Sequence, residues 1–166
     1  MRFHKLVDLI NFLTRSAVVI SFVAIIVFST AQIIFRYLVK NPLIGTEELA
    51  NFFQVWLVFI GTSIAIHDNS HIRVEILYKS IKPSKIKLAD TIIYLTVLIY
   101  SLIILFYGCR LVIVSHVIKS PALRWPLSIV FSALPISALF SCIYLVQKMV
   151  LAIKSFLKER DIIEKQ

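Results

Sequence analysis

The chain has 166 residues, of which 59% are hydrophobic and 16% are charged, whereas about a quarter of the residues in soluble domains are charged. The net charge of +9 does not indicate a nucleic-acid-binding protein, because the basic residues lie at the ends of apolar segments, where membrane topology accounts for them. Composition therefore predicts an integral membrane protein, and length predicts a single domain over residues 1–166. Cys109 and Cys142 lie inside apolar runs. We expect them to be buried and reduced rather than joined in a disulfide between membrane helices.

Four apolar runs are long enough to cross a bilayer. They lie at about residues 16–37, 49–66, 89–114 and 127–153. The first run could instead be a cleaved signal peptide, with Ser29-Thr30-Ala31 as a weak cleavage-like site. The apolar run continues past that site, so we expect a retained helix. The sequence predicts an all-α membrane protein with four transmembrane helices.

Basic residues predict the orientation of these helices. Thirteen of the 18 Lys and Arg residues lie near the N-terminus, between the second and third spans, or near the C-terminus. Because basic residues are enriched on the cytoplasmic side, both termini and the central loop are predicted to be cytoplasmic.

Two segments outside the spans have the spacing of amphipathic helices. The N-terminal segment predicts a short helix that lies on the cytoplasmic surface and leads into the first span, with apolar residues at Phe3, Leu6, Val7, Ile10 and Leu13. The central loop predicts a second interfacial helix, in which Arg73 and Lys79 reach lipid headgroups. Orientation and lipid contact are the favoured interpretation of these basic stretches, ahead of a regulatory site.

The second span carries a polar face. Its members are spaced by three or four residues and change from polar to small along the helix: Glu47, Asn51, Gln54, Val58, Gly61 and Ala65. Small residues allow a second helix to approach closely, and polar groups hydrogen-bond across such an interface. The face could pack within this chain or dock on a larger membrane partner. The acids Glu47 and Glu48 favour a partner, because carboxylates at the mouth of a membrane helix are costly when unpaired. Arg36, at the end of the first span, is the predicted counter-charge within the chain.

Motifs of catalysis and of cofactor binding are missing from the sequence. His67 and His71 have the spacing of a metal pair, but they flank a predicted helix break at 68–70. The histidines lie at span ends rather than deep in facing helices, which argues against haem. We therefore predict no enzyme activity, no cofactor and no metal.

The loop before the last span contains Pro121 and Pro126, which hold it extended, and Trp125, which suits the membrane interface. Pro135 is predicted to kink the last span, with Ser132 or a neighbour satisfying the carbonyl that it frees.

Several segments together resemble the small membrane subunit, Q or DctQ-type, of tripartite ATP-independent periplasmic (TRAP) transporters. The resemblance covers most of the chain and rests on the order of these segments: Phe35-Arg36-Tyr37, Glu47-Glu48-Leu49, Trp56-Leu57-Val58-Phe59-Ile60-Gly61-Thr62-Ser63, His71-Ile72-Arg73-Val74-Glu75-Ile76-Leu77, and Leu123-Arg124-Trp125-Pro126 leading to Leu134-Pro135-Ile136. One departure is Gly45-Thr46 before the acids, where an aromatic residue is expected nearby.

The resemblance implies a scaffold in the bacterial inner membrane that pairs with a large, elevator-type membrane subunit. That subunit performs sodium-coupled uptake of an organic acid, of the sialic acid or dicarboxylate class, delivered by a periplasmic binding protein. We predict that the large subunit contacts Glu47, Glu48, Asn51, Gln54, Gly61 and Ala65. We predict that the binding protein contacts Lys40, Lys119, Arg124 and Trp125.

Two other functions compete with this interpretation. A stand-alone four-helix exporter would need an acid deep within a span, whereas Glu47 and Glu48 lie at a span end. A structural or assembly subunit of another membrane complex has the same physical features, and only the family pattern separates it from a TRAP subunit.

Overall fold

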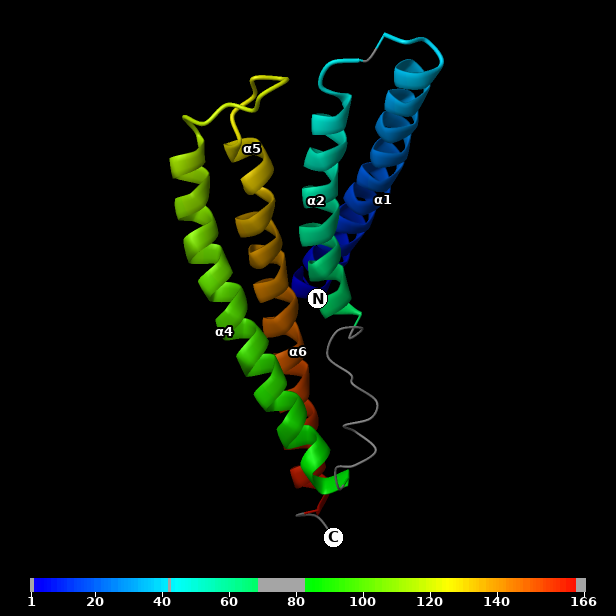
Figure 1. Ribbon diagram of the computed structural model, residues 1–166. Coiled ribbons are helices and arrows are strands. Elements are labelled where there is room, and N and C mark those ends of the chain that lie inside the picture. Colours follow the sequence, from blue (N-terminus) through cyan, green and yellow to red (C-terminus); the bar gives the residue numbers. More distant parts are fainter. Residues whose placement is uncertain (1, 42, 69–82, 164–166) are drawn as a thin grey trace.

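The computed structural model describes residues 2–41, 43–68 and 83–163 (Figure 1). Its elements are all helices: α1 (Arg2–Tyr37), α2 (Thr46–His67), α4 (Pro83–Ser115), α5 (Ser128–Phe131) and α6 (Ala133–Ile163). Four stretches are long and apolar enough to span a membrane: Val7–Tyr37, Thr46–His67, Asp90–Ser115 and Ser128–Val150. The predicted all-α, four-span architecture is confirmed. The interfacial helix expected in the central loop, with Arg73 and Lys79, lies outside the described residues.

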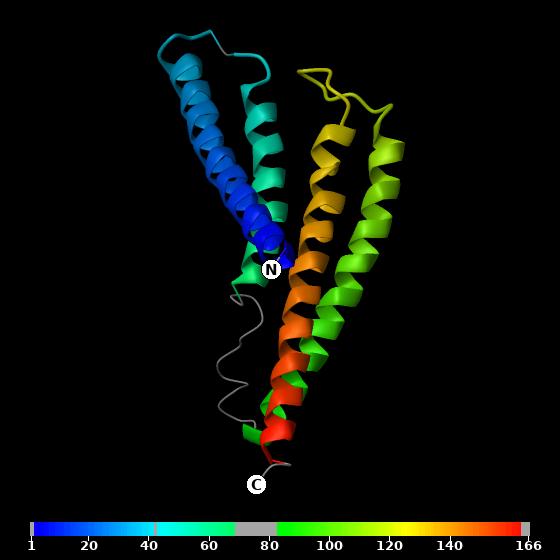
Figure 2. The same cartoon turned by 180° about the vertical axis from the view of Figure 1, so that it is seen from behind.

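The helices form two antiparallel pairs, α1 with α2 and α4 with α6, which meet where α2 packs against α6 (Figures 1 and 2). The connections over residues 38–45 and 116–127 lie together at one end of the molecule, which we call the loop end. We call the opposite end, toward which the last helix runs, the C-terminal end. Many large apolar side chains along the spans are exposed, as expected of surfaces that face lipid or another membrane protein.

The N-terminal segment is not a separate surface helix, because α1 runs unbroken from Arg2 to Tyr37. Part of it belongs to the core instead. Val7 is fully buried in a cluster with Ile66, Tyr144 and Leu145. The hydroxyl groups of Thr14 and Tyr144 lie 3.3 Å apart in a buried hydrogen bond, which joins α1 to α6. The apolar spacing was interpreted correctly as helical, but one of its faces packs on protein rather than on lipid.

Pro135 shapes the last span. It has no N–H group to bond to the carbonyl of Phe131, and α5 ends at that residue. The predicted kink therefore appears as the break between α5 and α6. The Ser132 hydroxyl donates to the carbonyl of Ile129 at 2.7 Å rather than to that of Phe131. A Cβ atom on Gly108 would lie 3.1 Å from Cδ of Pro135, so glycine permits α4 and α6 to approach closely here.

Most of the buried serines lie in the long helices and satisfy their hydroxyl groups within the same helix, whereas Ser128 pairs with His116. The acceptors are carbonyls three or four residues earlier, for Ser21, Ser63, Ser101, Ser115, Ser137 and Ser141. Such short side chains let helices pack closely without adding a hydrogen bond between them. Both cysteines are free; Cys142 is half-buried, but Cys109 is exposed, contrary to the expected burial.

Candidate interaction site

The polar face of α2 is uncovered. Glu47, Asn51 and Gln54 are exposed, and Val58 is 52% exposed. A Cβ atom on Gly61 would meet nothing within 4 Å. This face is therefore largely open in the described part of the chain, although Gly61 and Ala65 are half-buried. Its polar groups are available to another molecule.

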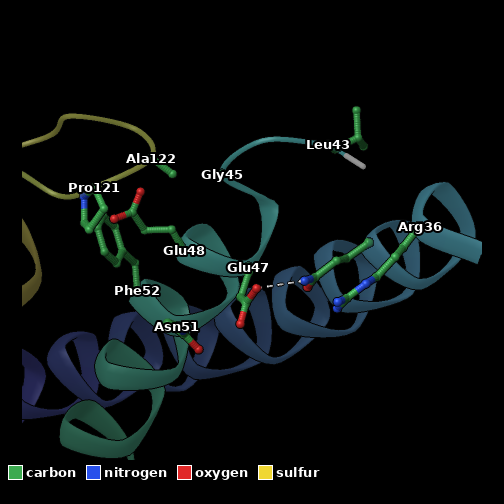
Figure 3. A pocket seen from close by; sticks show the side chains of 10 residues that line it. Arg36, Leu43, Gly45, Glu47, Glu48, Asn51, Phe52, Pro121 and Ala122 are labelled. Carbon is green, nitrogen blue, oxygen red and sulfur yellow. Dashed lines mark hydrogen bonds between the residues drawn. The ribbon is translucent and has the colours of Figure 1, made fainter. Parts of the chain in front are cut away.

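The two acids at the start of α2 point in different directions (Figure 3). Glu47 faces α1, where its Oε2 accepts a hydrogen bond from Nε2 of Gln32 at 3.0 Å. Glu48 faces the 118–127 loop, where its Oε2 accepts a hydrogen bond from the backbone N–H of Leu123 at 2.7 Å. The neighbouring carboxylates thus have separate environments, one exposed and one half-buried.

Within the described residues, Arg36 forms no ion pair with Glu47 or Glu48. It lines a cavity of about 630 Å³ with Glu47, Glu48 and Asn51. Two ion pairs within 4.0 Å involve Asp68 instead. The predicted direct counter-charge is therefore corrected: Gln32, one helical turn before Arg36, is the residue that bonds Glu47.

The 118–127 loop is tied to itself by backbone hydrogen bonds. Leu127 N–H donates to the carbonyl of Ile118 at 2.9 Å, and Ser120 N–H donates to that of Trp125 at 2.8 Å. Trp125 is 47% exposed, and Lys119 and Arg124 are exposed. Lys40, in the other connection at the loop end, is also exposed. Lys40 and Arg124 both have left-handed backbones, with φ values of 56° and 55°. The residues predicted to contact the binding protein therefore share one end of the molecule.

A second polar cluster, which the sequence did not lead us to predict, lies at the other end of α2. Arg15 Nη2 contacts Asp68 Oδ2 at 2.7 Å, and His67 Nδ1 lies 3.0 Å from Asp68 Oδ1. The hydrogen bond from His67, followed by the hydrogen bond and charge of Arg15, holds the pKa of Asp68 below its ordinary value. Lys148 donates to the carbonyl of Ile66. The four-span topology places Arg15 and Asp68 on the same side of the membrane, and this was the signal available for their pairing.

The clusters at the two ends are suited to recognition and assembly. In the part of the chain that the structure describes, no three His, Cys, Asp or Glu side chains come together to hold a metal ion. Polar groups either join helices or face outward along α2 and the loop end. This arrangement defines a multi-pass helical membrane protein with an exposed polar face.

The family model for tripartite ATP-independent periplasmic transporters, DctQ component, matches residues 24–155, and the chain belongs to this family. It is therefore a small permease component of a TRAP transporter in the inner membrane, and not an enzyme. This confirms the resemblance noted in the sequence.

Two relatives from Haemophilus influenzae support the assignment. The "Sialic acid TRAP transporter permease protein SiaT" of strain 86-028NP is 32% identical over 90 residues, which is 54% of this chain and 14% of the relative. The "Putative TRAP transporter small permease protein" of strain ATCC 51907 / DSM 11121 / KW20 / Rd is 28% identical over 65 residues, which is 39% of each chain. The matches thus span well under half of each relative's length.

Proposed function

We propose that this chain is the scaffold subunit of a TRAP transporter, and that it pairs with a large elevator-type membrane subunit for sodium-coupled uptake of an organic acid. The exposed polar face of α2 is the observation that carries this proposal. Amide and carboxylate groups on a helix of spanning length are costly in contact with lipid, so a protein partner is the favoured neighbour for Asn51 and Gln54.

The open space at Gly61 supports the same partner. Glycine within a helix costs about 0.5–1 kcal/mol relative to alanine. Nothing in the described part of this chain occupies the space that its missing side chain leaves. A helix of the large subunit that crosses α2 near Gly61 and Ala65 would use that space, and its polar groups would meet Glu47, Asn51 and Gln54.

The proposed orientation places the loop end in the periplasm and both termini in the cytoplasm, on the basis of the Lys and Arg distribution. Lys40, Lys119, Arg124 and Trp125 would then face the binding protein that delivers the substrate. The identity with a relative named for sialic acid favours that cargo over a dicarboxylate. Because specificity would reside in the binding protein and the large subunit, the present residues do not themselves select the cargo.

Affinity purification of the tagged chain from native membranes in mild detergent tests the pairing. The expected result is a stoichiometric large membrane protein, which is lost when Asn51 and Gln54 are both replaced by Leu. Thr96→Ala is the matched control, because Thr96 is exposed on α4 and bonds only within its own helix. Recovery of the wild-type chain alone after crosslinking in the membrane would contradict the proposal and favour a stand-alone protein.

A further inference from the structure

We infer that Glu48 is a positioning residue: its carboxylate fixes the 118–127 loop on the start of α2 and thereby sets the place of Lys119, Arg124 and Trp125. The docking role of that surface rests on the proposed function, whereas the fixing of the loop does not. Glu48 is accordingly removed from the predicted contacts with the large subunit, and Glu47 remains among them.

Leu123 is the point at which the loop is held. Its N–H donates to Glu48 Oε2 at 2.7 Å, across 75 residues of sequence. Its side chain lies over Gly45, where a Cβ atom would come within 2.7 Å of Leu123 Cδ2. Gly45 also has φ +90°, a conformation that favours glycine. These two requirements explain why glycine occupies position 45.

One contact can position the whole loop because the loop is tied internally. Besides the two backbone bonds already described, Arg124 N–H donates to the carbonyl of Ser120 at 3.1 Å, and Trp125 N–H donates to Ser120 Oγ at 3.2 Å. Arg124 adopts φ 55° within this network. A non-glycine residue keeps such a backbone only when its surroundings impose it. Movement of Leu123 would therefore move Arg124 and Trp125 with it.

The surface so positioned is basic and aromatic. Lys119 and Arg124 are exposed, Trp125 is about half exposed, and Lys40 lies at the same end of the molecule. The nearby carboxylates are held by hydrogen bonds, Glu48 to Leu123 and Glu47 to Gln32, and the exposed cations at this end outnumber them: Arg36, Lys40, Lys119 and Arg124. Charge complementarity therefore favours a protein partner with an acidic face, for which Trp125 and Arg124 supply the residue types that dominate binding energy at interfaces.

The test uses the full chain with its large subunit, in lipid nanodiscs for hydrogen exchange and in proteoliposomes for uptake, with the purified binding protein of the same system. We expect Glu48→Ala to accelerate hydrogen exchange at the Leu123 amide on the order of tenfold, since a bond to a charged acceptor is lost. The concentration of binding protein that half-saturates uptake should rise several-fold, with an unchanged yield of complex.

Two further variants serve as controls. Glu48→Gln retains an acceptor oxygen and should restore most of both quantities. Glu47→Ala, the matched control, should lower the yield of complex and leave loop exchange unchanged.

Unchanged exchange in Glu48→Ala would overturn the positioning role. Faster exchange with unchanged half-saturation would overturn the docking consequence. A loss of complex with unchanged exchange would return Glu48 to the subunit contacts.

If no large subunit accompanies the wild-type chain, the proposed function fails, but hydrogen exchange in the chain alone still decides whether Glu48 positions the loop. If Glu48→Ala does not accumulate, Leu123→Ala removes the packing on Gly45 and should likewise accelerate exchange in the loop; unchanged exchange there would also overturn the inference.

Discussion

Arg15 donates from Nη2 to both carboxylate oxygens of Asp68, at 2.8 and 2.7 Å, and so joins α1 to the residue that follows α2. Arg15 Nε is held in turn by Asn11 Oδ1 at 3.0 Å. Asp68 is also hydrogen-bonded to the His67 ring, which packs edge-on against Tyr144 of α6. Three spans therefore converge on this cluster.

A double-mutant cycle on Arg15→Ala and Asp68→Ala should give a coupling of about 0.2–1 kcal/mol in the free energy of unfolding. The value is small because the two side chains are 51% and 36% exposed, so that solvent screens them. Chemical unfolding of the purified chain in detergent measures this coupling. A coupling of zero would mean that the pair orients the helices without stabilising them.

Acid should weaken the same contact. Since the pKa of Asp68 is lowered in the folded chain, its stabilising contribution is complete above the ordinary value of 3.8. The contribution is then lost as the pH falls through the lower, folded value. The thermal midpoint of the wild type should therefore fall more steeply below about pH 4 than that of Asp68→Asn, which does not titrate at this position. Parallel curves for the two proteins would show that Asp68 is not responsible.

Removal of the Tyr144 hydroxyl should destabilise the chain. Tyr144→Phe keeps the buried ring but deletes the hydrogen bond to Thr14, at a cost of about 0.5–1.5 kcal/mol. Tyr100→Phe is the matched control, because Tyr100 is 62% exposed and should change the thermal midpoint little. Equal effects of the two substitutions would argue against the buried bond.

Two glycines should respond in opposite ways to the addition of a side chain. Gly61→Ala should leave the isolated chain as stable or slightly more stable, because its Cβ meets open space. Gly108→Ala should destabilise the chain by about 1–3 kcal/mol, because its Cβ lies 3.1 Å from Cδ of Pro135. Unfolding in detergent measures both.

The larger variant Gly61→Leu separates folding from assembly. We expect it to leave the chain folded and to reduce co-purification of the large subunit. An unaltered yield of complex would remove Gly61 from the proposed interface.

Cysteine labelling tests the proposed orientation. In a chain whose own Cys109 and Cys142 are replaced by Ser, a membrane-impermeant maleimide should label Lys40→Cys and Lys119→Cys in intact spheroplasts. Lys165→Cys should be labelled only after the membrane is permeabilised. The reverse pattern would invert the topology that the basic residues predict.

Hydropathy predicted the spans well, because each is a long apolar run whose end carries a polar or charged residue. Hydropathy did not predict that Val7 and Thr14 are buried against α6, since a contact between the first and last spans depends on how the helices cross. Amphipathic spacing is the same whether the apolar face meets lipid or protein.

The candidate site was predicted in part. The face from Glu47 to Ala65 followed from helical periodicity; its polar end is exposed and its small end is half-buried, and its role as a partner surface is the proposal made above. The separate roles of Glu47 and Glu48 did not follow from periodicity. The partner of Glu48 is a backbone N–H group, which any residue at position 123 other than proline would supply. Arg36 was expected to pair with the acids because it is close to them in sequence. In the structure, Glu47 accepts a hydrogen bond from Gln32 instead.

The local satisfaction of the buried serines has a consequence for the membrane that surrounds the chain. Side-chain bonds between helices gather toward the two ends, at Glu47 and Glu48 and at Arg15, Tyr144 and Asp68. Between them, Trp56 Nε1 donates to the carbonyl of Ile129 at 3.3 Å, and the buried serines let the helices pack closely. A bilayer thicker or thinner than the separation of these two clusters would draw charged groups into hydrocarbon or expose apolar surface to water. We therefore expect the chain to be most stable in a bilayer whose hydrophobic thickness matches that separation.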